Sequence, residues 1–418
     1  MPDTAISKSK FRRRRVVIGF ALLLLAVVGA VAWLDRNERL AAKSCLARNQ
    51  WKEARARLSR LLWWHPSDAS VRMMLAEAYA RDDSLPSRSS AERAVAILKD
   101  IPDDVAESVE ARIREARLRF LLLRQPMQAG RILQRAVVVG PKAMDAHSLH
   151  WRIFDMTGRS DLCEPIFQQL YELSSPQQRI DYLRDWFFSQ NDPERITARL
   201  DEMLGFRDSP DESARRLELK RLIAFRQSEP NEPLIHAAIA RWFQDEGDIE
   251  QALLVAEEAR SILHAMSDPL FVFVLVSVLI ESGRLEQAAT AFDQWPGLRE
   301  GYAYWKIAGL LQENLHRNYG AASVAYAKSL AIWPGHADWR CQFRQATCLA
   351  LSGQKELADS TRQHATEVQQ LFRPDHRQRL QQALLAPHET PNRDVILEFY
   401  RTLRRTDEAQ YWQQITVQ

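Results

Sequence analysis

The sequence is poor in cysteine, glycine and proline. Among its 418 residues there are only four cysteines, 14 glycines and 18 prolines. The four cysteines, Cys45, Cys163, Cys341 and Cys348, form no CxxC pair, so neither a zinc ribbon nor a dithiol redox site is expected. No long stretch alternates apolar with polar residues, which argues against β-sheets. These absences together predict an all-α protein.

Sequence motifs for chemistry are also missing. There is no phosphate-binding glycine loop, zinc-peptidase motif, serine-hydrolase elbow or calcium loop. His147 and His150 lie one helical turn apart, but no carboxylate spacing completes a metal site, so we expect them to be structural. Cys163 falls where two helices are expected to cross, which favours packing over a nucleophile. The sequence therefore predicts no enzyme activity, metal, cofactor or small-molecule substrate.

Charge is nearly balanced over the chain, at a net value of +3. The first 15 residues hold six Lys or Arg residues and one Asp, which gives +5 and leaves 3 − 5 = −2 for the rest. A body with so little net charge lacks the basic footprint of a nucleic-acid-binding protein. We therefore expect no nucleic-acid partner.

One long apolar run stands out near the amino end. Residues 16–34 contain no charge, follow four consecutive arginines and would extend about 28 Å as a helix, enough to span a bilayer. We expect residues 1–15 to form a basic cytoplasmic tail and 16–34 a single transmembrane helix with Trp33 at the interface. Two alternatives stay open: a signal peptide cleaved near Ala32, and the inverted topology.

A repeated pattern follows in the remainder of the chain. The segment Gly247-Asp-Ile-Glu-Gln-Ala252 is answered 36 residues later by Gly283-Arg-Leu-Glu-Gln-Ala288. Each glycine is preceded by one apolar helical pattern and followed by another. A period of this length predicts stacked helix pairs, each too small to bury its own apolar face.

Small residues mark the same step along much of the sequence. They occupy Ala54, Ala94, Ala129, Cys163, Ala252, Ala288, Ala322 and Ala358. Most gaps are 34–36 residues, one is 40, and one of 89 spans a stretch where the register is lost. Proline residues close some of the copies, as Pro66 does. This pattern resembles that of the tetratricopeptide repeat family.

The resemblance implies a right-handed α-solenoid of antiparallel helix pairs behind the transmembrane helix. We expect repeats at 35–173, degenerate helical repeats at 174–232, further repeats at 233–372 and capping helices at 373–418. The apolar run Leu270–Ile280 is too short to span a membrane, so we interpret it as a buried first helix of a pair.

In this family the first helices line a concave groove that takes an extended or helical peptide. By register, the groove residues of this chain are Met73, Glu77, Arg114, Arg152, Arg241, Phe273, Tyr304 and Arg340. Arginines suit carboxylates and aromatic rings suit apolar side chains, although solvated surface residues are the alternative interpretation. Trp63 and Trp64 are adjacent on a helix and point about 100° apart, so they join Trp33 as membrane-interface candidates.

Taken together, the sequence predicts a bacterial scaffold or adaptor that binds protein or peptide partners at the cell envelope. It would be a single-pass protein of the cytoplasmic (inner) membrane, with its N-terminus in the cytoplasm and its solenoid outside. The alternative function is a subunit of a secretion or surface-polysaccharide export or assembly machine. A third possibility is an enzyme whose site lies in residues 174–232.

Overall fold

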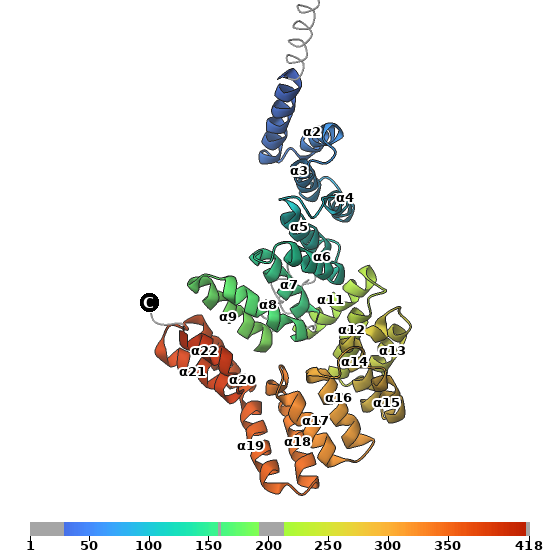
Figure 1. Ribbon diagram of the computed structural model, residues 1–418, viewed down its shortest axis with the longest axis vertical. Coiled ribbons are helices and arrows are strands. Elements are labelled where there is room, and N and C mark those ends of the chain that lie inside the picture. The colour runs from blue at the N-terminus through green and yellow to red at the C-terminus, as the bar shows by residue number, and fades with distance from the viewer. Residues whose placement is uncertain (1–28, 158–159, 192–212, 415–418) are drawn as a thin grey trace, which may run out of the picture. The chain divides into compact units, whose positions relative to one another are not determined.

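The computed structural model describes residues 29–157, 160–191 and 213–414. All regular elements in these ranges are helices, as the sequence predicts (Figure 1). The predicted basic tail and most of the predicted span lie outside the described residues. Within them, no helix is both long enough and apolar enough to cross a membrane.

The chain divides into two compact units, which we describe separately. The first comprises residues 1–123 and 138–140, and the second comprises 124–137 and 141–418. The described part of the first unit opens with a helix over residues 29–47, called the N-terminal helix below. It continues with α2 (Trp51–Trp64), α3 (Ala69–Ala80), α4 (Ser87–Lys99) and α5 (Ser108–Leu121).

The second unit contains most of the helices. In chain order they are α6 (Pro126–Val139, whose end belongs to the first unit), α7 (Met144–Met156), α8 (Ser160–Leu173), α9 (Pro176–Asn191), α11 (Ala214–Ser228), α12 (Pro233–Asp245), α13 (Ile249–Arg260), α14 (Pro269–Glu281), α15 (Leu285–Asp293), α16 (Gly301–Asn314), α17 (Tyr319–Leu330), α18 (Trp339–Leu351), α19 (Lys355–Leu371), α20 (Pro374–Leu385), α21 (Thr390–Thr402) and α22 (Thr406–Gln414). Short 3₁₀ turns precede α14 and α18.

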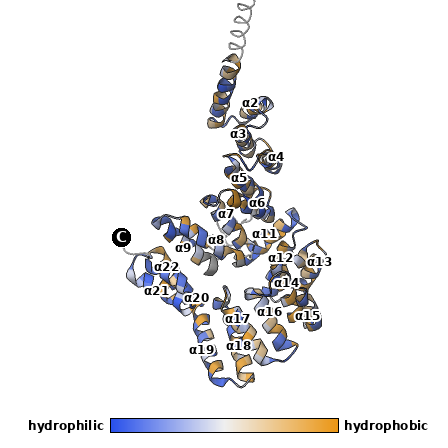
Figure 2. Cartoon of the chain, in the orientation of Figure 1, coloured by the Kyte–Doolittle hydropathy of each residue, from blue (hydrophilic) through white to orange (hydrophobic). Residues whose placement is uncertain are grey.

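The small-residue register is confirmed. All eight predicted small residues lie on the second helix of a pair, and each is at most 4% exposed. A small side chain lets two helix axes approach closely, which explains why alanine recurs at this position. Each second helix packs against the first helices on either side of it in α12–α14 and in α16–α19. Helix α14 is buried along most of its length, as expected for Leu270–Ile280. Its residues are mostly apolar, which is the orange end of the hydropathy scale in Figure 2.

One turn geometry joins the two helices of many pairs. Gly247, Gly283 and Gly353 have φ of +82°, +77° and +87°, and the second helix starts two residues after each of them. The next N–H donates to a carbonyl in the last turn of the first helix, as from Asp248 to Phe243. Glycine adopts this left-handed conformation without steric cost, so its recurrence is explained by the turn.

The same turn also occurs where the sequence has no glycine. Asn49, Arg317 and Arg404 have φ of +58°, +54° and +57°, again two residues before a helix. The N-terminal helix with α2, and α21 with α22, are therefore helix pairs built like the predicted repeats. The sequence predicts the first of these pairs through Ala54, whereas it predicts α21 and α22 only as capping helices.

The end of the second unit packs against its beginning. Tyr411 of α22 lies 4.3 Å from Tyr171 of α8 between ring centroids, and Phe399 of α21 lies 5.0 Å from Phe187 of α9. These rings share one apolar core with Trp151 of α7. The second unit therefore closes on itself, with α20–α22 beside α8 and α9 (Figure 1). The predicted capping helices thus contribute to an internal core.

Candidate partner-binding site

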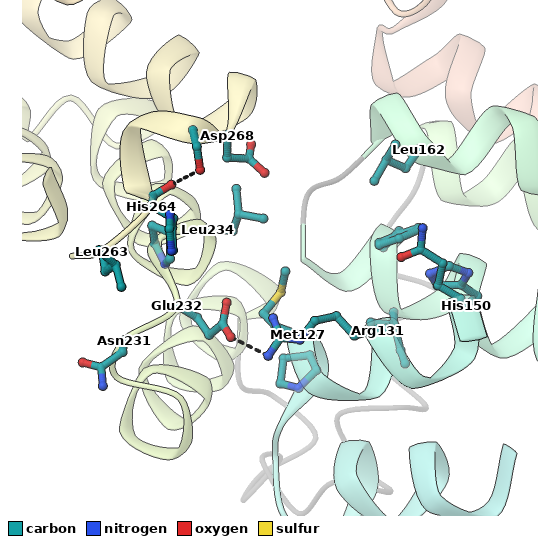
Figure 3. A pocket seen from close by; sticks show the side chains of 17 residues that line it. Met127, Arg131, His150, Leu162, Asn231, Glu232, Leu234, Leu263, His264 and Asp268 are labelled. Atoms are coloured by element: carbon teal, nitrogen blue, oxygen red, sulfur yellow. Dashed lines mark hydrogen bonds and ion pairs between the residues drawn. The ribbon is translucent and has the colours of Figure 1, made fainter. Parts of the chain in front are cut away.

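A partly open cavity of about 490 Å³ lies within the second unit. One wall comes from α6, α7 and the start of α8, and the other from the loop before α12, the start of α12 and the connection into α14 (Figure 3). Met127, Ile153, Phe154, Leu162 and Leu234 give the cavity its apolar lining. Residues more than 100 positions apart therefore form one site.

Hydrogen bonds join the two walls at the amino end of α6. The Glu229 carboxylate accepts hydrogen bonds from the backbone N–H groups of Met127 and Gln128, both at 3.0 Å. These N–H groups have no partner within their own helix, so Glu229 caps α6 from another segment. Burial raises the pKa of Glu229 to about 7, despite the two N–H donors.

A charged pair crosses the cavity close to this cap. Arg131 Nη2 donates to Glu232 Oε1 at 2.6 Å, and Figure 3 shows the arginine reaching from α6 to the opposite wall. The Arg131 side chain is 57% exposed, so solvent screens the pair and it contributes little to stability. An incoming group of either charge can therefore exchange with one partner at small cost.

His150 provides a neutral polar group on the α7 wall. Burial, with a smaller contribution from His147, lowers the pKa of His150 to about 4, so the ring is uncharged at neutral pH. Its Nε2 is buried and has no hydrogen-bond partner among the described atoms. The ring packs on Phe154 at 4.2 Å between centroids. A ligand group that hydrogen-bonds this nitrogen would satisfy a buried polar atom.

The neighbouring His147 has a structural role, as the sequence predicted for this histidine pair. Its Nε2 lies 2.9 Å from the Pro141 carbonyl oxygen, six residues back along the chain. His236 of α12 makes the same contact with the Pro230 carbonyl at 3.0 Å. Both rings tie the start of a first helix to the preceding turn. No cluster of three potential metal ligands occurs in the residues that the structure describes.

None of the eight groove residues predicted from the sequence lines this cavity. In the first unit, Arg114 Nη1 lies 3.4 Å from Glu77 Oε2, so these two residues are brought together. Met73 is only 7% exposed and packs in the core, where it offers a partner little surface.

The other predicted groove residues belong to the second unit. Arg152, Arg241 and Arg340 are exposed, and Arg340 lies over the ring of Trp339. Phe273 contacts Tyr302, whereas Tyr304 packs against Phe292 and Trp295. Tyr302 and Tyr304 are two positions apart on α16 and thus point in different directions. Phe273 and Tyr304 therefore belong to separate aromatic contacts.

The three membrane-interface candidates are exposed in the first unit. The exposed fractions are 63% for Trp33, 81% for Trp63 and 43% for Trp64. Their assignment to a membrane interface stays a prediction.

Comparison with known proteins gives only weak similarities. No protein-family model matches the sequence, and no relative is found among curated proteins. The solved Cut9–Hcn1 hetero-tetramer of APC/C matches with 11% identity and a TM-score of 0.39, covering 91% of this chain and 86% of its own. Pseudomonas aeruginosa PilF matches with 14% identity and a TM-score of 0.27, covering 55% and 93%. The human IFIT1 dimer with m7Gppp-AAAA matches with 14% identity and 0.28, covering 78% and 80%. Scores this low establish neither the family nor the function of this chain.

Proposed function

We propose that the protein is a membrane-anchored helical-repeat scaffold that binds a peptide segment of a partner protein in the cavity between α6–α8 and α12–α14. The main support for this proposal is the shape and lining of the cavity. Its apolar lining suits a hydrophobic side chain, and the unpartnered Nε2 of His150 and the Arg131–Glu232 pair suit the polar main chain around it.

The mechanism in this proposal is binding alone. A site preformed between two sets of helices costs little ordering of the protein when a peptide enters. The apolar run at residues 16–34 supports a bilayer anchor, which would hold the scaffold in two dimensions and raise its effective concentration toward membrane partners. A cell-envelope location, with the repeats outside the cytoplasmic membrane, belongs to the same proposal and is supported by the four consecutive arginines directly before the run.

Gly130 offers a direct way to fill the cavity. It lies on α6 in the cavity wall, and a Cβ there would lie 3.9 Å from both Ile153 Cγ2 and Phe154 Cε1, which is ordinary contact. Gly130→Ala should therefore fold normally, while Gly130→Phe places a ring in the space that the peptide would use. The test is in-cell photo-crosslinking from a benzoylphenylalanine at Leu263, which is 78% exposed and lines the cavity.

The expected result is a defined crosslinked partner that persists in Gly130→Ala and is lost in Gly130→Phe. A benzoylphenylalanine at Leu254, which is 62% exposed and outside the cavity lining, is the matched control and should not capture it. An unchanged partner in Gly130→Phe would exclude the cavity as the binding site. The identity of the partner would also separate a general envelope adaptor from the alternative, a subunit of a secretion or surface-polysaccharide machine.

A further inference from the structure

The first helix pair returns the chain to the end of the predicted membrane span. The N-terminal helix leads away from residue 34, the turn at Asn49 reverses direction, and α2 runs back alongside (Figure 1). Arg57 Nη1 bonds Glu38 Oε2 at 2.9 Å, and His65 Nε2 lies 3.1 Å from Asp35 Oδ1. The earlier residue of the N-terminal helix, Asp35, contacts the later residue of the α2 segment, His65. The two helices are therefore antiparallel, and α2 ends beside Asp35.

Asp35 is the first charged residue after the apolar run. Arg39 contacts both Asp35 at 2.9 Å and Asp68, just before α3, at 2.7 Å. The start of the polar chain is therefore held to residues 65–68 by the Arg39–Asp68 ion pair and by the contact between His65 and Asp35. Trp63 and Trp64 immediately precede this fastened segment.

The surface beside Asp35 exposes large apolar side chains that are not part of the protein core. Trp63 is 81% exposed, more than any other large apolar side chain in the described residues. On the N-terminal helix, Trp33 and Leu34 are also exposed, at 63% and 46%. Tryptophan combines a large apolar ring with a polar N–H and is enriched where bilayers meet water.

The same helix pair is strongly basic. Residues 35–65 contain eight Lys or Arg residues and three Asp or Glu residues, which gives 8 − 3 = +5. With +5 in residues 1–15, the rest of the chain carries 3 − 5 − 5 = −7. Positive charge beside exposed tryptophans is complementary to the negative charge of anionic lipid headgroups.

We propose that the end of α2 is a second membrane contact, with Trp63 and Trp64 in the headgroup region of the bilayer that holds residues 16–34. This inference rests on the proposed anchor. The Arg39–Asp68 ion pair and the His65–Asp35 contact place the tryptophans beside the end of that anchor. Two contacts, one spanning and one interfacial, restrict how the first unit tilts against the membrane.

The test uses the full-length protein in phosphatidylcholine–phosphatidylglycerol vesicles, with Cys45→Ser to remove the half-buried thiol. A bimane label is attached at Trp63→Cys, and quenching is compared between lipids that carry a nitroxide near the headgroup and near the chain end. Arg81→Cys is the control, because Arg81 follows the far end of α3 and its side chain is 64% exposed. A third label at Leu25→Cys reports on the anchor.

We expect severalfold stronger quenching at position 63 than at position 81, mainly from the shallow nitroxide, together with deep quenching at position 25. Quenching at 25 with none at 63 would overturn the second contact and leave the anchor intact. That outcome would point to a protein or a second copy as the partner of the tryptophans. No quenching at position 25 would overturn the anchor and, with it, this inference.

Discussion

Arg405 and Glu164 are 241 residues apart in sequence, yet Arg405 Nη2 lies 2.8 Å from Glu164 Oε1. Arg405 also pairs with Glu408 at the start of α22, and its guanidinium lies 4.2 Å from the centre of the Trp333 ring. Only 5% of the Arg405 side chain is exposed. A single arginine therefore links α8, α22 and the segment that follows α17, and it stabilises the closure of the second unit.

Replacing this arginine should loosen the closure locally. Arg405→Met removes the positive charge that pairs with Glu164 and Glu408. The free energy of unfolding should fall by about 2 kcal/mol or more, because both carboxylates lose their partner. We expect faster amide hydrogen exchange in α20–α22 and α8, with exchange in α2–α4 of the first unit unchanged. Adding Glu164→Gln should cost less in the Arg405→Met background than in the wild type. Additive effects of the two substitutions would show that the contact does not couple them.

Glu229 should make stability depend on pH. The folded-state pKa of Glu229 is about 7 against an ordinary value of 4.5, so between these pH values the folded chain keeps a proton that the unfolded chain releases. The free energy of unfolding should therefore fall as pH rises from about 4.5 to 7, by roughly 3 kcal/mol at most from this group, and then level off. Urea denaturation across this range measures the effect.

Two variants separate the contributions to this pH dependence. Glu229→Gln should flatten the curve, because an amide does not titrate. Asp155, whose pKa burial also raises to about 7 against the opposing charge of Arg221, should account for part of the remaining slope. Glu229→Gln/Asp155→Asn should therefore be flatter still. A Glu229→Gln protein with the full wild-type slope would contradict the assignment.

Arg317 occupies the left-handed turn position that glycine fills in three other pairs. A non-glycine residue there costs about 1 kcal/mol or more in backbone energy, so Arg317→Gly should raise the free energy of unfolding by about 0.5–1 kcal/mol. Its side chain is exposed, so little packing is lost. The converse change, Gly283→Ala at φ +77°, should lower stability by about 1 kcal/mol. Thermal unfolding checks both predictions: the midpoint should rise for Arg317→Gly and fall for Gly283→Ala.

Gly309 is needed for a different reason. A Cβ at this position of α16 would lie 2.5 Å from Tyr326 Cε1, and Tyr326 is fully buried and bonded to Glu313. Gly309→Ala should therefore lower stability by about 1–3 kcal/mol through overpacking. Gly320→Ala on α17 is the control, since its Cβ would meet only Asn318 Oδ1 at 3.8 Å. That variant should be as stable as the wild type or slightly more stable.

Much of the fold could be predicted because the repeats leave a local mark. Ala54, Ala252 and Ala358 identify second helices far apart in the chain, since each helix crossing needs a small residue within its own short segment. The turns were predictable only where glycine marks them. Asn49 and Arg404 adopt the same left-handed conformation without being glycine, so the sequence does not reveal the turns of the first and last helix pairs.

The candidate site could not be predicted because it depends on contacts between distant segments. Glu229 belongs to a stretch where the register is lost, and nothing in the sequence indicates that it caps α6. The predicted groove assumed that every repeat presents the same surface. Met73 does not fit this assumption. It lies on α3, which α4 and α5 cover, so its side chain is in the core and not in a groove.

The closure of the second unit has a consequence for synthesis of the chain on the ribosome. A linear array can fold as its repeats emerge, because each repeat contacts mainly its neighbours. Here Trp151, Phe167 and Phe187 share a core with residues near 400–412, which are made much later. Contacts of such large sequence separation slow folding and leave apolar surface uncovered meanwhile. The α7–α9 segment therefore keeps part of its aromatic surface exposed until α21 and α22 have left the ribosome.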